Sequence, residues 1–144
     1  MKVFLKLVLS FCLASTITIS SVSQAGVAVV VSQNNTTQTM SIEEVRRLFL
    51  KKNKSFKSGV KAEPLDQVKE NKVRNMFYKK VVNKGPSQLT SYWSRMIFTG
   101  KGTPPKVAGN DESVINSVSK NVNAIGYIDS ASVDKRVKVL LTVN

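Results

Sequence analysis

The stretch "NDESVINSVSKNVNAIGYIDSA", residues 110–131, has the pattern of a helix followed directly by a strand. Asn110 or Asp111 can cap the helix, because both side chains accept hydrogen bonds from the first backbone N–H groups. "AIGYI" at 124–128 is short and apolar, which is typical of a buried strand. Between them, three apolar residues fall on one helical face: Val114, Ile115 and Val118. The stretch therefore predicts one helix–strand unit of a layered fold.

Toward the N-terminus the same alternation continues. "VAVVVS" at 27–32 is a β-branched run and predicts a buried strand. Ser41 and Glu44 form the S-x-x-E pattern of a capping box, which predicts a helix start. The apolar face of that helix would carry Ile42, Val45, Leu48 and Phe49. "VKAEPL" at 60–65 could be a strand, where Pro64 favours a sheet edge or a strand end.

Two more helices and a last strand complete the pattern. We expect helices over 68–82 and from Pro86, and a strand over 137–143 with alternate residues on one face. The second helix has the clearest apolar stripe: Leu89, Tyr92, Trp93, Met96 and Ile97. Strands that alternate with helices predict a layered α/β fold.

The first 25 residues have the three parts of a secretory signal peptide. Two lysines are followed by an apolar segment at 7–19, and Ser23 and Ala25 suit the −3 and −1 positions of a cleavage site. The apolar run is shorter than the roughly 20 residues that a membrane span needs. We therefore expect cleavage after Ala25 and an exported domain of residues 26–144 with no stable membrane insertion.

Composition then excludes several kinds of chemistry. Removing 25 of the 144 residues leaves 119, a length that suits one domain. This part has no His and no Cys, since the one Cys is Cys12. A Ser-His pair, a Cys nucleophile and an ordinary zinc site are therefore excluded, and we expect no enzyme, metal or cofactor. The net charge of +13, or +11 without Lys2 and Lys6, favours anionic partners.

"FTGKGTPPK" at 98–106 has some features of a phosphate loop. The Walker pattern fails, because Gly102 follows Lys101 and because Arg95 stands where the first Gly belongs. We expect a turn-rich loop between two helices. Its lysines could still contact an anion.

A second basic segment surrounds Phe56, which we expect to be a packing residue. It could bind an anionic surface such as lipopolysaccharide, polyphosphate or lipid. A run of charges is more often an exposed, solvated loop, and we favour that interpretation. The segment contains Lys51, Lys52, Lys54 and Lys57.

Three stretches together resemble the phosphate ABC transporter substrate-binding family, and most of all its short single-domain members. They are "SIEEVRRLFLKKNKSF" at 41–56, "FTGKGTPPK" at 98–106 and the opening stretch at 110–131. The resemblance covers roughly residues 27 to 131. It implies a single three-layer α/β lobe like one domain, the second, of a type 2 periplasmic binding protein. It also implies a periplasmic location, and an oxyanion as ligand.

The family's oxyanion segment is an Arg-x-x-Gly-Ser-Gly-Thr-like helix start, where backbone N–H groups face the negative charge. The matching stretch here is "PLDQVKENKVRNMF" at 64–77. Gln67 stands at the position of the Arg, Asn71 stands near the Ser, and both glycines are missing. Lysines could supply charge instead, as point charges without a bidentate fork. With the basic loop added, the expected ligand-binding residues are Gln67, Lys69, Asn71, Lys72, Lys101 and Thr103.

Two functions remain open at this point. The chain could bind inorganic phosphate or a similar oxyanion without covalent chemistry and serve an ABC permease. Alternatively, it could be an accessory module that has the fold but no small-ligand site, and that docks to an envelope partner or anionic polymer by its basic surface. Nucleic acid is not an expected partner, because the chain is exported and has no evident stacking platform.

Overall fold

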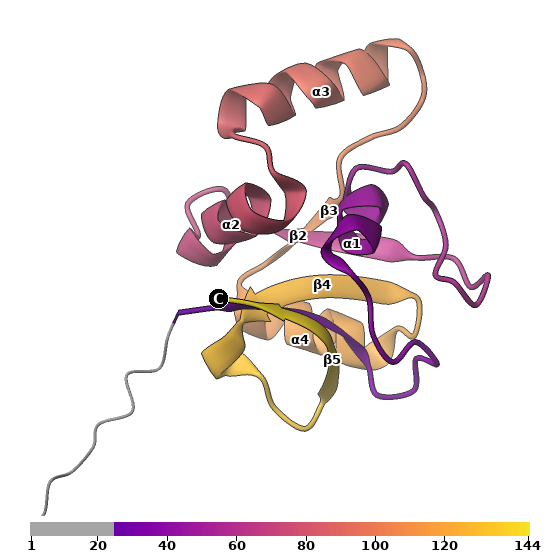
Figure 1. The fold of residues 1–144 in the computed structure, drawn as a ribbon, viewed down its shortest axis with the longest axis vertical. Helices are drawn as coiled ribbons and strands as arrows, with labels where there is room; N and C mark the ends of the chain where they lie inside the picture. Colours follow the sequence, from indigo (N-terminus) through magenta and orange to yellow (C-terminus); the bar gives the residue numbers. More distant parts are fainter. Residues whose placement is uncertain (1–24) are drawn as a thin grey trace, which may run out of the picture.

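The computed structural model describes residues 25–144, so the predicted signal segment up to residue 24 lies outside the described residues. Five strands and four α-helices follow in the order β1, α1, β2, α2, α3, β3, α4, β4, β5 (Figure 1). A π-turn extends α2, and a short 3-10 turn follows β4. The bounds are β1 Val27–Ser32, α1 Ile42–Phe49, β2 Glu63–Gln67, α2 Lys72–Phe77, the π-turn Tyr78–Val82, α3 Pro86–Phe98, β3 Lys106–Gly109, α4 Asp111–Lys120, β4 Ala124–Asp129, the 3-10 turn Ser130–Ser132 and β5 Val137–Val143.

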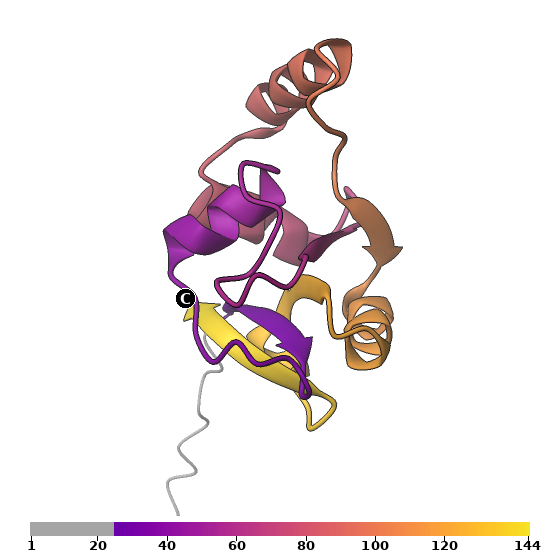
Figure 2. The same cartoon turned by 90° about the vertical axis from the view of Figure 1, so that its right-hand side faces the viewer.

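The five strands form one mixed sheet in the order β3-β2-β4-β1-β5. Strands β3, β2 and β4 run parallel, whereas β1 runs antiparallel to both of its neighbours. Alternate residues of β1 pack in two separate apolar clusters, one on each face of the sheet. Helix α4 covers one face and α1, α2 and α3 contribute to the other (Figure 2). The predicted three-layer α/β lobe is confirmed.

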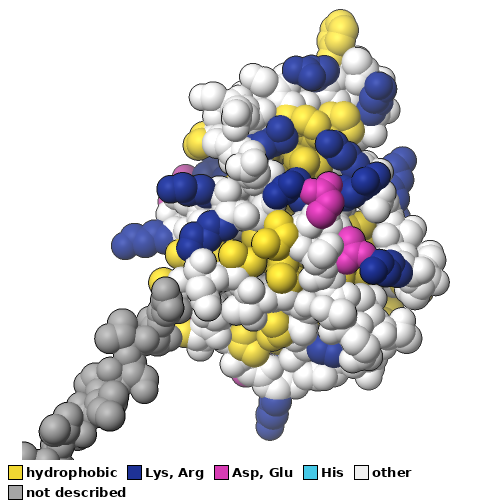
Figure 3. All heavy atoms as spheres, in the orientation of Figure 1, with side chains coloured by type: hydrophobic (Ala, Val, Ile, Leu, Met, Phe, Trp, Pro, Cys, Tyr) yellow, Lys and Arg dark blue, Asp and Glu magenta, His cyan; other side chains and the backbone are white. Residues whose placement is uncertain are grey.

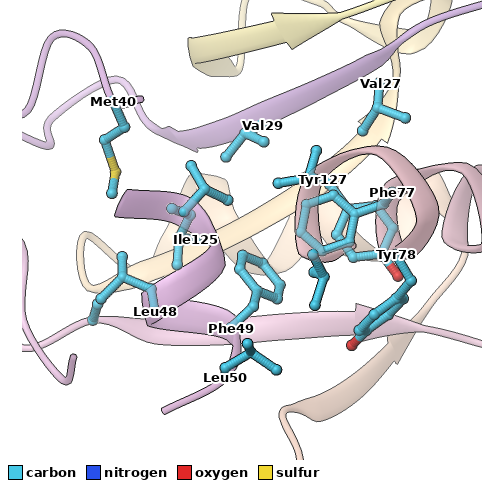
Figure 4. Close-up of a cluster of buried hydrophobic side chains, with 14 of the residues drawn as sticks. Val27, Val29, Met40, Leu48, Phe49, Leu50, Phe77, Tyr78, Ile125 and Tyr127 are labelled. Carbon is cyan, nitrogen blue, oxygen red and sulfur yellow. The ribbon is translucent and has the colours of Figure 1, made fainter. Parts of the chain in front are cut away.

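The larger cluster is built around aromatic rings (Figure 4). Phe77 stacks on Tyr127 with 3.9 Å between ring centroids, and Phe49 meets Phe77 edge-on at 4.7 Å. Such pairs are worth about 0.5–1.5 kcal/mol beyond the area they bury. These ring contacts pack α1 and α2 against β4, and thereby position the loops at both ends of β2.

On the opposite face, α4 lies very close to β4. A Cβ atom on Gly126 would come within 2.4 Å of a methyl carbon of Val114, so only glycine fits there. Asn110 caps α4 through its side chain, which accepts from the Ser113 N–H. The predicted unit of residues 110–131 is therefore confirmed in both its helix and its strand.

Of two other expectations from the sequence, one is confirmed and one is partly wrong. The capping box of Ser41 and Glu44 is confirmed, with both of its hydrogen bonds formed. The β2 strand lies inside the sheet, so the edge position suggested by Pro64 is wrong and the strand-end alternative is right. Pro64 is tolerated there because β3 pairs with β2 only from Leu65 onward, so a missing N–H costs no β3 hydrogen bond.

Three further differences have local causes. Strand β3 was not expected, because two of its four residues are exposed, the other two are only half-buried, and the four carry no periodic pattern. Ile97 was expected in the core but is 55% exposed, since α3 runs past the body of the domain by that point. In β5 the register shifts opposite Val29 and Val30, so the expected single face is split and Leu140 is buried instead.

Candidate functional site

The side chain of Gln67 lies at the end of β2 and is fully buried. Its Nε2 donates to the Tyr127 carbonyl and to Asp111 Oδ1, both at 2.8 Å. Its Oε1 accepts from Asn71 Nδ2 at 2.5 Å. Asn71 in turn caps α2 by accepting from the Val73 N–H. The amide of Gln67 therefore joins the ends of β2 and β4 to the starts of α2 and α4.

The neighbouring carboxylate of Asp66 is also buried and is surrounded by donors. It accepts from the Gln67 N–H at 2.8 Å and the Tyr78 hydroxyl at 3.0 Å, and also from the Tyr127 hydroxyl. Arg74 forms an ion pair with it at 3.1 Å. Burial, and then the charge of Asp66, raise the pKa values of both tyrosines, so their hydroxyls stay protonated as donors.

The carboxyl ends of β2, β3 and β4 meet beside this network, and a cavity of about 530 Å³ lies there. We call it the strand-end pocket. In α/β folds ligands often bind outside the carboxyl ends of the strands. Its lining residues are Asn71, Asn110, Asp111, Glu112, Ile115 and Ser132.

The polar groups of the strand-end pocket are already bonded within the protein. Asp111 Oδ2 accepts from the Asp129 N–H at 3.0 Å and from the Ser132 hydroxyl at 2.7 Å. Glu112 forms an ion pair with Arg136 at 2.8 Å, and this guanidinium lowers the pKa of Glu112. Two carboxylates line the pocket and no Lys or Arg does, so its charge disfavours a phosphate.

A second cavity, of about 200 Å³, lies at the other end of β2. It is formed where the loop after α1, the residues just before β2 and the loop after α3 come together. We call it the lysine pocket. Its lining residues are Lys51, Lys54, Lys61, Ala62, Lys101, Gly102 and Thr103. Four lysines and one threonine therefore line a space of small-anion size.

The lysine pocket has little internal charge compensation. Within residues 25–144, Lys61 lies 3.9 Å from Glu63, and the other three lysines make no ion pair. Burial, followed by the charge of Lys61, lowers the pKa of Lys51. An anion bound between these side chains would relieve their mutual repulsion.

Lys51 also has an unusual backbone conformation. The Lys51 N–H donates to Leu48 O and the Lys52 N–H to Arg47 O, which is the Schellman arrangement that ends α1. Lys51 has φ of 58°, at a position where glycine is the usual residue. A side chain in this conformation costs about 1–2 kcal/mol. This conformation places the Lys51 side chain against Gly102, where an added Cβ atom would lie 3.7 Å from the Cβ of Lys51.

The structure does not bring the six expected ligand residues into one site. Gln67 and Asn71 bond to each other at the strand ends, whereas Lys101 and Thr103 line the lysine pocket. Ala62, which lines the lysine pocket, precedes Gln67 by five residues, or about 16 Å of extended chain. Lys69 and Lys72 are exposed and line neither pocket. A ligand role for each of the six stays a prediction.

Sequence reasoning missed two parts of the lysine pocket. Lys51 and Lys54 were noted as a basic segment but not linked to Lys101, and Lys61 was not considered. Only the fold shows this grouping. The loops lie about forty residues apart in the sequence, and the pairing of β2 with β3 brings them side by side.

Two further findings bear on the kind of site. In the described part of the chain, no three His, Cys, Asp or Glu side chains are placed to hold a metal ion. No helix of residues 25–144 has the length and apolar character that crossing a bilayer requires.

Solved structures with the same fold come from transport proteins. An ABC-type phosphate transport receptor from Vibrio cholerae matches with a TM-score of 0.65 and 19% identity, over 81% of this chain and 45% of that one. A phosphate ABC transporter substrate-binding protein from Clostridium perfringens, with bound phosphate, matches with a TM-score of 0.64 and 18% identity, over 81% and 44%. PstS from Borrelia burgdorferi gives a TM-score of 0.61 and 12% identity, over 81% and 46%.

The chain has the fold of part of a phosphate-binding protein. It spans less than half the length of these relatives. No family model and no curated protein matches the sequence. The resemblance expected from residues 27–131 is thereby confirmed at the level of the fold.

Proposed function

We propose that this protein is a non-enzymatic binding protein for phosphate or a related oxyanion, and that the anion sits in the lysine pocket. One observation carries the proposal: four lysines and Thr103 line one small cavity. Each ammonium offers three donors to an oxyanion, and hydrogen bonds to charged groups are the stronger kind. The phosphate-binding relatives with the same fold support the ligand class.

The alternative location for the anion is the strand-end pocket, where Gln67 and Asn71 lie. It is the weaker candidate because Gln67, Asn71 and Asp111 already bond to one another. An oxyanion there would have to break these bonds and approach two carboxylates. Binding in the lysine pocket would require neither the loss of these hydrogen bonds nor an approach to these two carboxylates.

We propose further that the protein works in the periplasm beside an ABC permease. The signal-like pattern of residues 1–25 supports export, and the ABC transport proteins that share the fold support the permease. Since the chain spans less than half of their length, delivery to a permease is an extension of the binding proposal and is tested separately from it.

A second candidate function uses the same basic surface for a larger partner. Lysines and arginines extend well beyond the pocket, over α3 and the elements below it (Figure 3). This spread favours an accessory module that docks to an anionic envelope polymer or partner. Such a module would bind long polyphosphate much more tightly than single phosphate ions, and its binding would weaken steeply with salt.

The test is a calorimetric titration of purified protein with inorganic phosphate at low and at physiological salt. We expect binding that persists at physiological salt, and a loss of about fivefold in Lys101→Ala, because one charge-assisted contact is removed. Lys120→Ala, at the exposed end of α4, is the control of equal charge and should bind as the unmodified protein does. Equal losses in the two variants would overturn the lysine-pocket site. Binding only by long polyphosphate would favour the docking module.

A further inference from the structure

A groove of about 480 Å³ lies between the π-turn and the start of α3. The lysine pocket lies beyond the other end of α3, which has 13 residues and is about 20 Å long. The groove and the lysine pocket are therefore separate sites. Binding of a ligand in the groove does not depend on phosphate binding in the lysine pocket. We call this groove the α3 groove. Its lining includes Arg74, Tyr78, Lys79, Lys84, Gln88 and Leu89.

The rim of the α3 groove is cationic. Lys79, Lys84 and Arg74 line it, and no Asp or Glu does. Among the described residues, neither lysine has an ion-pair partner, and the Nη1 of Arg74 has no hydrogen-bond acceptor. Figure 3 shows Lys and Arg side chains around apolar ones in the region between α2 and α3. The groove therefore offers an anion two lysines without ion-pair partners, next to Arg74, whose charge is paired with Asp66.

The floor of the α3 groove is apolar and rigid. Tyr78 is 4% exposed and Leu89 is 6% exposed. The Tyr78 hydroxyl donates to Asp66 at 3.0 Å, and the Arg74 guanidinium lies 4.5 Å from the centre of its ring. A surface fixed before binding loses little entropy when a ligand arrives.

The π-turn explains how the cations come to surround this floor. The Tyr78 carbonyl accepts from the N–H groups of both Asn83 and Lys84, and Asn83 has φ of 58°. These bonds return the chain to the start of the turn, so the Lys84 backbone lies beside that of Tyr78 although Lys84 comes six positions later. A π-turn is rare and often lies at a functional site. Here it joins an apolar floor to a basic rim.

We propose that the α3 groove binds a small organic anion in which one phosphate or carboxylate group is attached to an apolar body. The rim matches the charge and the floor matches the apolar part. The groove volume lies in the range of small-molecule sites, about 300–1,000 Å³. Inorganic phosphate would leave the floor uncovered, and a neutral apolar molecule would leave the rim unpaired.

The test compares phenyl phosphate with inorganic phosphate and benzyl alcohol, by following backbone amide signals of residues 74–89 in NMR titrations. We expect phenyl phosphate to shift these signals at lower concentration than either other probe. In the double variant Lys79→Ala, Lys84→Ala its Kd should rise about tenfold, because two charged contacts are lost. Both lysines are exposed, so the variant should keep its melting temperature.

The matched control is the double variant Lys80→Ala, Lys120→Ala. It removes the same charge from two exposed residues that do not line the groove. The proposal is overturned if the two double variants bind phenyl phosphate equally, if residues 74–89 do not respond, or if inorganic phosphate gives the same shifts with the same Kd. Loss of phosphate binding in Lys101→Ala would not contradict the α3-groove proposal, since that variant tests the lysine pocket.

Discussion

The strand-end pocket and the lysine pocket lie at opposite ends of β2 but use their polar side chains differently. At the strand ends, Asp66 and Gln67 are buried and bond to neighbouring elements. At the other end, Lys51 and Lys101 line a cavity without an ion-pair partner in the described chain. The first arrangement stabilises the fold, and the second leaves charge available for a ligand. Variants at the two ends should therefore change different properties.

The largest effect is expected for Asp66→Asn. This change removes the charge that pairs with the mostly buried Arg74, and breaking a buried ion pair costs about 3 kcal/mol or more. Urea unfolding should show that loss, while the phosphate affinity of the folded protein stays unchanged. The control is Asp134→Asn, whose solvent-screened ion pair with Arg136 should contribute much less to stability. A loss as small as in the control would mean that the Asp66 network does not hold the strand ends.

A smaller loss is expected for Gln67→Leu. Leucine is similar in size but leaves Asn71, Asp111 and the Tyr127 carbonyl with one partner fewer, at a cost of about 2 kcal/mol. Thermal unfolding measures the loss, with the exposed Gln38→Leu as control. If Gln67→Leu also abolished phosphate binding in protein that remains folded, the anion would belong at the strand ends.

At the lysine pocket, Lys51→Gly should have two effects of opposite sign. Glycine removes the strain of the left-handed conformation and should raise stability by about 1 kcal/mol. The same change removes a pocket cation and should weaken phosphate binding. Lys52→Gly, one residue later, should only lose stability, by about 0.4–1 kcal/mol, because glycine makes the unfolded chain more flexible. Unfolding and calorimetry on both variants measure the contrast, and unchanged phosphate binding in Lys51→Gly would remove this side chain from the site.

The smallest effect concerns pH. Burial and Lys61 lower the pKa of Lys51, so the folded protein loses this proton at a lower pH than the unfolded chain. Stability should therefore rise slightly with pH through that range, because the unfolded state binds more protons there. Affinity for sulfate, which keeps its charge in alkaline solution, should fall over the same range. Lys51→Gly should abolish both changes, and an unchanged pH dependence in that variant would contradict the assignment.

Much of the fold could be predicted because local patterns agreed with it. The β-branched run of 27–32, the capping box at Ser41 and the stretch at 110–131 each match the observed element. Strand β3 could not be predicted, because an exposed edge strand needs no apolar pattern. The π-turn and the bulge in β5 also lack a local signal, since packing against other elements decides them.

The candidate site was less predictable than the fold. The comparison with a known motif pointed to Gln67 and Asn71 but could not show that they bond to each other. Lys101 and Thr103 were expected near an anion, yet the residues that complete their pocket come from loops elsewhere in the chain. Charge can be counted in a sequence, but only the topology decides which charges converge.

The most direct test of which end of β2 takes the anion is a phosphate titration followed by the backbone amide signals of the whole domain. We predict saturable shifts at residues 51–62 and 100–103, with residues 67–71 and 110–113 unchanged. Shifts confined to 67–71 and 110–113 would place the oxyanion at the strand ends and contradict the lysine pocket. The absence of any saturable shift would contradict the oxyanion-binding function itself.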